Sequence, residues 1–181
     1  MRVIAGSARK MRLKAPRGND IRPTADQVKE ALFSIIGNRV VGAIFLDLFA
    51  GSGAIGIEAL SRGAGKAIFV DSSRQSILLI KENLSRTGFS EKASVLESDA
   101  LQAIKGLSIK KIKADLIYLD PPYAEKLNTL VIDKIIEHAI IANNGLIIVE
   151  HAYDDQDWAQ PYPVIKQKKY GRKGLTIIPF P

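Results

Sequence analysis

The sequence contains no cysteine and only two histidines among its 181 residues. Without cysteine the chain can form no disulfide and no Cys-based zinc site, and it offers no thiol nucleophile. His138 and His151 cannot build a multi-histidine site, so we expect no metal centre. No apolar run approaches the roughly 18 residues that a membrane span requires, and residues 1–7 lack the apolar core of a secretory signal. We therefore expect a cytoplasmic protein with no membrane partner.

The composition is that of an ordinary globular protein. Apolar residues make up 46% and charged residues 25% of the chain, which excludes intrinsic disorder and low-complexity architecture. The length suits a single domain over residues 1–181. Within it we distinguish a basic N-terminal part, residues 1–40, from a core, residues 41–181, and we expect a monomer.

The net charge of +7 is concentrated at the two ends of the chain. Residues 1–22 hold seven cations and one acid, and residues 158–181 hold five cations and no acid, whereas the middle is net acidic. Lysine and arginine that neutralise phosphates release counterions, which gives non-specific affinity for a polyanion. The same charges would equally serve as solvated faces that keep the protein soluble.

Short β-rich runs alternate with amphipathic stretches through the middle of the chain, which is typical of parallel strands joined by crossover helices. The predicted strands are 44–48, 67–70, 94–96, 116–119 and 146–149, and the predicted helices are 55–62, 74–86, 100–107 and 127–141. The pattern predicts an α/β fold of the Rossmann-like type, with a mostly parallel sheet and helices on both faces. Ligands bind such sheets at the carboxyl ends of the strands, so functional residues should follow residues 48, 70, 96 and 119.

The two ends of the chain predict additions to this core. Residues 2–15 form a short basic extension, which we expect to be a small hairpin, and a helix begins within residues 23–27 and stops at Gly37. Residues 164–170 and 175–180 flank the turn 171–174 and predict a closing antiparallel hairpin.

A glycine-rich turn follows the first core strand. Gly51, Gly53 and Gly56 match G-x-G-x-x-G, and Asp71 follows Gly51 by 20 residues, so the spacing fits a dinucleotide site. Asp47 at the strand end argues against that ligand, because its carboxylate would repel a pyrophosphate but attract a cationic group. S-adenosylmethionine has such cationic groups, an ammonium and a sulfonium, and is therefore the other candidate ligand. The alternative is that the glycines only form a tight turn.

Two further acids follow the next strands. Asp71 can accept hydrogen bonds from ribose hydroxyls with either ligand, and Asp99, or the backbone beside it, can accept one from an adenine amino group. The alternative for Asp99 is that it only caps a helix.

Residues 120–123, Asp-Pro-Pro-Tyr, directly follow the apolar strand 116–119. Consecutive prolines hold the backbone extended, so they fix the directions of the Asp120 side chain and the Pro121 carbonyl group. Asp120 and the Pro121 carbonyl group could accept the two hydrogens of an exocyclic amine on a nucleobase, which favours a pyramidal nitrogen with a localised lone pair. Tyr123 can stack on that nucleobase. The alternative is a buried tyrosine after an ordinary Pro-Pro turn.

These motifs carry a family resemblance. Residues 47–56 resemble motif I of Rossmann-like methyltransferases, and residues 120–123 resemble motif IV of the enzymes that methylate adenine N6 or guanine N2. Together with residues 2–6 and 21–33, the segment 47–64 is similar to the RsmD family, guanine-N2 methyltransferases of 16S ribosomal RNA. The resemblance covers essentially the whole chain and loosens at residues 178–181.

The resemblance implies methyl transfer from S-adenosylmethionine to N2 of one guanine of 16S rRNA, with 30S particles as the substrate. By motif position it assigns the methionine part of the cofactor to Asp47, Gly51 and Gly53, the ribose to Asp71, the adenine to Asp99 and Ala100, and the target base to Asp120, Pro121, Pro122 and Tyr123. From the N-terminal part we expect RNA contacts by Arg2, Arg9, Lys10, Arg12 and Arg22.

Three other functions remain open from the sequence. An adenine-N6 methyltransferase acting on DNA or RNA would use the same Asp-Pro-Pro-Tyr geometry. An NAD-binding oxidoreductase fits the glycine spacing but is disfavoured by Asp47 and gives residues 120–123 no role. A non-catalytic RNA-binding module would explain the basic ends and leave both motifs without a function.

Overall fold

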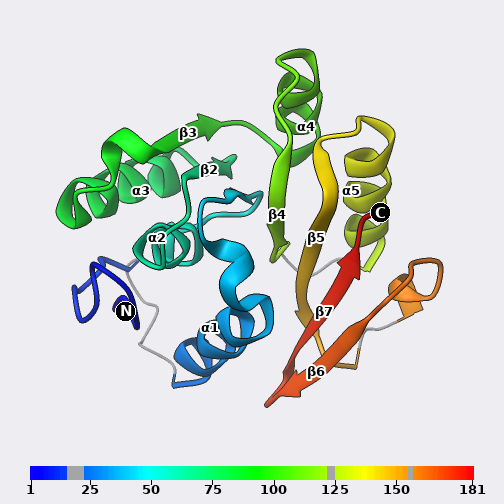
Figure 1. Cartoon of the computed structure of the whole chain (residues 1–181), viewed down its shortest axis with the longest axis horizontal. Helices are drawn as coiled ribbons and strands as arrows, with labels where there is room; N and C mark the ends of the chain where they lie inside the picture. Colours follow the sequence, from blue (N-terminus) through cyan, green and yellow to red (C-terminus); the bar gives the residue numbers. More distant parts are fainter. Residues whose placement is uncertain (16–22, 122–124, 155–156) are drawn as a thin grey trace.

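The computed structural model describes residues 1–15, 23–121, 125–154 and 157–181. A central seven-stranded sheet has the strand order β3-β2-β1-β4-β5-β7-β6 (Figure 1). The strands are β1 (Ile44–Asp47), β2 (Lys66–Asp71), β3 (Ala93–Glu97), β4 (Ala114–Leu119), β5 (Ile141–Ala152), β6 (Lys166–Tyr170) and β7 (Lys173–Pro179). The helices are α1 (Pro23–Ile36), α2 (Ala54–Ser61), α3 (Arg74–Thr87), α4 (Ala100–Ile109) and α5 (Glu125–Glu137).

Strands β1 to β5 are parallel, whereas β7 runs antiparallel to β5, and β6 runs antiparallel to β7. The predicted Rossmann-like α/β fold, with its mostly parallel sheet and closing hairpin, is therefore confirmed. From β1 the chain adds β2 and β3 on one side and β4 and β5 on the other. The gap between β1 and β4 is therefore the topological switch point, beside which open α/β sheets bind ligands.

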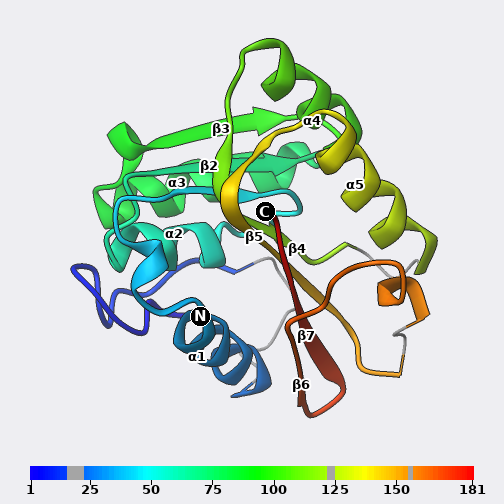
Figure 2. The same ribbon diagram turned by 45° about the vertical axis from the view of Figure 1, so that its right-hand side comes forward.

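Helices cover both faces of the sheet, because successive strand residues point to opposite sides. Phe45 of β1 packs in one buried cluster with residues of α1, α2 and α3, and its neighbour Leu46 packs in a second cluster with residues of α4 and α5. Figure 2 shows the sheet between these two groups of helices. None of the described helices is both long and apolar enough to cross a membrane.

The predicted helix 127–141 was wrong at its C-terminal end. Helix α5 ends at Glu137, and Ile141 already pairs with Ala114 of β4 as the first residue of β5. Ala139 adopts a left-handed conformation at φ 51°, and the Ile140 N–H donates to the Ile135 carbonyl oxygen. This helix ending usually uses glycine, so alanine at that position concealed it from sequence inspection.

The predicted N-terminal hairpin is present as a short antiparallel pairing centred on the bridge between Arg2 and Arg12, where the Val3 N–H donates to the Met11 carbonyl oxygen and the Leu13 N–H donates to the Met1 carbonyl oxygen. The arm, which we define as residues 1–15, also packs against α2. Gly6, at φ 82°, lies so close to α2 that a Cβ atom there would be 1.8 Å from the Ser61 carbonyl oxygen. The Ser7 N–H donates to that same oxygen at 2.8 Å.

The closing hairpin is tighter than predicted. Tyr170 pairs with Lys173 across a turn of only two residues, Gly171 and Arg172, so Lys173 is the first residue of β7 and not part of a four-residue loop. This shift of two residues brings the Lys173 side chain to the end of the sheet where β4 stops.

Candidate active site

Two adjoining cavities open at the carboxyl ends of the parallel strands. The larger, of about 400 Å³, follows the ends of β1, β2, β3 and β4, and the smaller, of about 240 Å³, lies between the glycine turn and α1. Phe49, Asp120 and Glu150 line both. Functional residues were predicted at these strand ends, and the structure brings them together there.

The glycine turn connects β1 to α2. Gly51 lines the smaller cavity at φ 53°, and its N–H donates to Asp71 Oδ2 at 2.8 Å. Gly53 starts α2 at φ 77° and is not among the residues that line either cavity. A Cβ atom on Gly56 would be 2.3 Å from the Phe69 ring, so this third glycine lets α2 pack directly on β2.

Asp47 is a buried carboxylate beside the smaller cavity. Both of its oxygens are buried without a hydrogen-bond partner among the described residues. Burial raises the pKa of Asp47 to about 7, although the backbone groups of Gly56 and Phe49 approach the carboxylate and oppose the rise. An uncompensated buried acid is costly when ionised, so a cationic group in the adjoining cavity would stabilise it.

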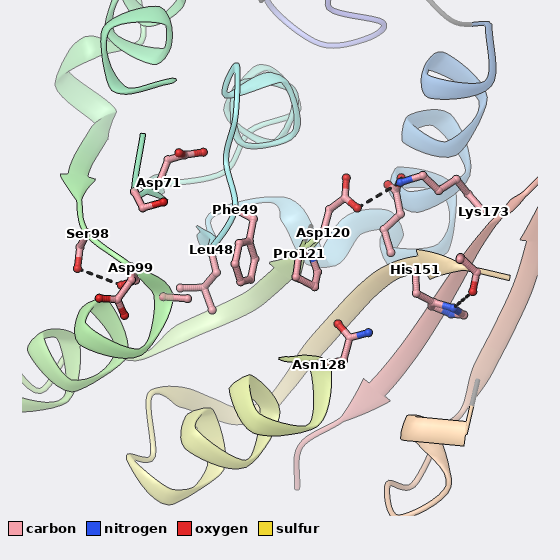
Figure 3. Close-up of a pocket in the computed structure, with 14 residues that line it drawn as sticks. Leu48, Phe49, Asp71, Ser98, Asp99, Asp120, Pro121, Asn128, His151 and Lys173 are labelled. Atoms are coloured by element: carbon pink, nitrogen blue, oxygen red, sulfur yellow. Dashed lines mark hydrogen bonds and ion pairs between the residues drawn. The ribbon is translucent and has the colours of Figure 1, made fainter. Parts of the chain in front are cut away.

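The acids after β2 and β3 lie on one side of the larger cavity (Figure 3). Asp71 holds the glycine turn through Oδ2 and accepts the Ser73 N–H through Oδ1 at 2.8 Å. Asp99 caps α4, because Asp99 Oδ1 accepts the Gln102 N–H at 3.0 Å, as the alternative interpretation had it. Ala100 lines the same side of the cavity.

Asp120 lies on the other side of the larger cavity, next to Pro121 (Figure 3). Lys173 Nζ is 3.2 Å from Asp120 Oδ1 and 2.8 Å from Glu150 Oε1, and the Tyr118 hydroxyl donates to Glu150 Oε2. Partial burial and the Glu150 carboxylate raise the pKa of Asp120 to about 6, against the opposing effect of Lys173. Pro122 and Tyr123 lie outside the described residues.

Several residues that line the larger cavity were not predicted from the sequence, among them Asn128, Glu150, His151 and Lys173. The His151 ring is fixed between the Ala152 carbonyl oxygen at 2.7 Å and Thr176 Oγ1 at 2.8 Å. Glu150, near the end of a strand, followed the rule for strand ends and could have been found by it. In the part of the chain that the structure describes, no group of three or more potential metal ligands is arranged to hold an ion.

The predicted RNA-binding cations of the arm are all exposed. These residues are Arg2, Arg9, Lys10 and Arg12, whereas Arg22 lies outside the described residues. Arg2 Nε lies 3.6 Å from Asp26 Oδ2, and Met1 of the same arm lines the smaller cavity. The basic arm therefore borders the site.

A buried cluster fastens the arm beside the cavities. Glu58 Oε2 accepts the Ile4 N–H at 2.8 Å and Glu58 Oε1 accepts the Ala5 N–H at 3.0 Å. Asn83 Oδ1 accepts the Lys14 N–H at 2.8 Å, while Asn83 Nδ2 donates to the Ser52 carbonyl oxygen in the glycine turn at 2.9 Å. The position of the arm is thus coupled directly to the turn that lines the smaller cavity.

Comparisons with known proteins agree with this architecture. The family model described as "Conserved hypothetical protein 95" matches residues 1–179. The chain is 38% identical to the putative rRNA methyltransferase YlbH of Bacillus subtilis, over 98% of this chain and 97% of that protein. It is 35% identical to ribosomal RNA small subunit methyltransferase D of Escherichia coli, over 83% of this chain and 74% of that one.

A solved structure, the putative methyltransferase yhhF of Escherichia coli, superimposes on this chain with a TM-score of 0.84 at 27% identity. The superposition covers 99% of this chain and 97% of the yhhF chain. The fold, the site and these matches lead to one assignment. The chain belongs to the conserved hypothetical protein 95 family, a family of RsmD-like methyltransferases that use S-adenosylmethionine.

Proposed function

We propose that this protein methylates ribosomal RNA, and specifically the exocyclic N2 amine of one guanine of 16S rRNA in 30S particles. The names of two relatives, an rRNA methyltransferase and a ribosomal RNA small subunit methyltransferase, support the substrate class. The observation that carries the proposal is the place of Asp120, which lines both cavities where they meet.

The residues present fit S-adenosylmethionine. When bound, it supplies an electrophilic methyl group on a sulfonium. Asp47, uncompensated and buried beside the smaller cavity, favours the positive charge of the cofactor, and Gly51 leaves room for its methionine part. Asp71 retains free acceptor capacity for ribose hydroxyls, because each carboxylate oxygen can accept more than one hydrogen bond. We assign the adenine to Asp99 and Ala100, which line the larger cavity.

Asp120 and the Pro121 carbonyl group act on the target amine. The nitrogen of an amine conjugated with a nucleobase is a poor nucleophile, because its lone pair is delocalised. Acceptance of its two hydrogens by Asp120 and Pro121 favours a localised lone pair directed at the methyl group. With a pKa of about 6, Asp120 is largely ionised at neutral pH and can accept such a hydrogen bond.

The basic arm would contact the RNA backbone. Met1 of the arm lines the smaller cavity, and the exposed Arg2 lies beside Asp26 at its rim, so phosphate contacts by the arm would orient the RNA over the site without reading its sequence. Phosphate contacts of this kind give salt-dependent affinity.

Labelled methyl transfer to undermethylated 30S particles and to isolated rRNA tests the proposal. We expect incorporation into 16S rRNA and N2-methylguanosine on nucleoside analysis. N6-methyladenosine would replace guanine by adenine as the target, and incorporation into neither substrate would refute the rRNA assignment. In parallel calorimetry we expect binding of S-adenosylmethionine and not of NAD, because Asp47 repels a pyrophosphate.

The Asp120→Ala variant separates the target amine from the cofactor. We expect turnover to fall by at least about 10²-fold while the Kd for S-adenosylmethionine changes by less than about threefold. Equal losses in both would mean that Asp120 supports the pocket and not the amine.

A further inference from the structure

The closing hairpin places Lys173 beside Asp120, which directly follows β4. Lys173 lies opposite Ala152 in the antiparallel pairing of β5 with β7, so Glu150, two residues before Ala152, lies on the same face and on the diagonal. Tyr118 of β4 pairs with Ile148 in the parallel ladder between β4 and β5, which places its hydroxyl beside Glu150. Side chains of three adjacent strands thus meet where the chain leaves β4 at Asp120.

Local packing fixes the position of the backbone from which the Lys173 side chain extends. A Cβ atom on the next residue, Gly174, would lie 2.6 Å from the His151 ring, so only glycine allows the ring to sit against this part of β7. His151 is itself held at both ring nitrogens. The backbone from which Lys173 projects is therefore well defined, and Figure 3 shows the side chain directed at Asp120.

We propose that Lys173 is a positioning residue for methyl transfer, whose ammonium group orients the Asp120 carboxylate toward the target amine while Glu150 holds the ammonium in place. The proposal rests on the proposed function, because it gives Asp120 the task of accepting a hydrogen of the amine. Lys173 touches neither the methyl group nor the base. In the reaction an N–C bond forms, the S–C bond breaks, and the nitrogen then releases one proton to solvent, so the charge of Lys173 does not change.

Two observations favour a positioning role over a merely structural ion pair. The Lys173 and Asp120 side chains are 33% and 38% exposed, and a pair with this exposure contributes little to stability. Its effect on the charge of Asp120 is larger, because the Glu150 carboxylate at this junction opposes ionisation of Asp120 and the Lys173 ammonium group counters it. Lys29 and Asp26 line the adjoining cavity as a further cation and anion.

Without Lys173, Asp120 would keep the unfavourable influence of the Glu150 carboxylate and lose the ammonium group that opposes it. An opposite charge within hydrogen-bonding distance lowers a carboxyl pKa by roughly 1–3 units, so its removal should raise the pKa of Asp120 toward or above neutrality. A protonated Asp120 presents a donor where the amine also presents a donor. The lysine thus maintains both the direction and the charge that the amine requires.

The test compares Lys173→Met and Lys173→Arg with Lys105→Met, which removes the same charge from an exposed position on α4. We expect kcat of Lys173→Met at neutral pH to fall on the order of 10²-fold, with the KM for RNA and the Kd for S-adenosylmethionine within about threefold. The acid limb of its pH–rate profile should move up by about one unit. Lys173→Arg should keep the wild-type limb, and Lys105→Met should match the wild type throughout.

Glu150→Gln should move the acid limb of the pH–rate profile to lower pH, because Glu150 raises the pKa of Asp120. The same two shifts should appear in the pKa of Asp120 measured by carboxyl-carbon NMR on the free protein, with Asp120→Asn for assignment.

A kcat of Lys173→Met within threefold of the wild type, or a loss of kcat without a displaced acid limb, overturns the inference. The pKa of Asp120 measured by NMR separates failure of the proposed function from failure of the coupling between Lys173 and Asp120. If the wild type transfers no methyl to rRNA yet Lys173→Met still raises the pKa of Asp120, the proposed substrate fails and the Lys173–Asp120 coupling stands. If neither Lys173→Met nor Glu150→Gln moves the pKa of Asp120, the coupling itself is wrong.

Discussion

Substitution of Glu58 by alanine should detach the N-terminal arm and destabilise the whole protein. Glu58 is fully buried on α2, and besides the Ile4 and Ala5 N–H groups it accepts a hydrogen bond from Arg62 Nε at 2.8 Å. The Lys29 side chain is only 3% exposed, and its Nζ lies 3.6 Å from Glu58 Oε2. Burial lowers the pKa of Lys29, and the Glu58 carboxylate is the main influence that opposes this.

The size of the effect follows from what the substitution leaves behind. Removal of one partner of a buried ion pair costs about 3–5 kcal/mol, because the other charge stays buried without compensation. Two backbone N–H groups also lose their acceptor, at roughly 1–3 kcal/mol each where water cannot replace it. Neutralisation of Lys29 and entry of water reduce the sum, so we expect a loss of about 4–6 kcal/mol. For a chain of this length that corresponds to a decrease in Tm of roughly 8–24 °C.

Urea unfolding at pH 7, followed by far-UV circular dichroism, measures the free energy of unfolding of Glu58→Ala and the wild type. The control is Glu97→Ala, which removes an exposed ion pair with Arg74 and should change that free energy by at most about 1 kcal/mol. Amide exchange at Ile4 and Ala5 should become fast in Glu58→Ala only. A loss below about 1 kcal/mol, or unchanged exchange in the arm, would refute the reasoning.

Three further predictions concern the site and the arm. Burial holds the pKa of Asp47 at about 7, so the folded protein keeps a proton that the unfolded chain releases near pH 4, and stability falls as pH rises through that window. Asp47→Asn should remove a contribution of roughly 3 kcal/mol to the difference in unfolding free energy between pH 5 and pH 8, measured with urea, and an unchanged difference would contradict it. Gly6→Ala should destabilise the fold by more than about 2 kcal/mol in the same assay, because its φ is positive and its Cβ would overlap α2, and a neutral result would mean that the arm is not docked there. Charge reversal of Arg9, Lys10 and Arg12 together should weaken RNA binding and flatten its salt dependence in filter-binding titrations; a wild-type slope would remove the arm from the RNA interface.

The order of elements and the position of the site could be predicted from the sequence, because both depend on local patterns. The alternation of β-rich runs with amphipathic stretches specifies a parallel sheet, and the parallel sheet places Asp47, Asp71, Asp99 and Asp120 at one edge. The turn at residues 51–53 was equally evident, since glycine is the residue type that adopts its positive φ values without strain.

Tertiary structure alone decided which partners these residues have. Lys173 was assigned to a loop, and only the register of β7 on β5 brings it to Asp120, 53 positions away in the sequence. Glu58 had the appearance of an ordinary helix residue, yet it is the buried acceptor of the arm, because Gly6 permits a close approach of two segments. Such contacts depend on strand register and on packing between elements distant in sequence, and no local periodicity encodes either.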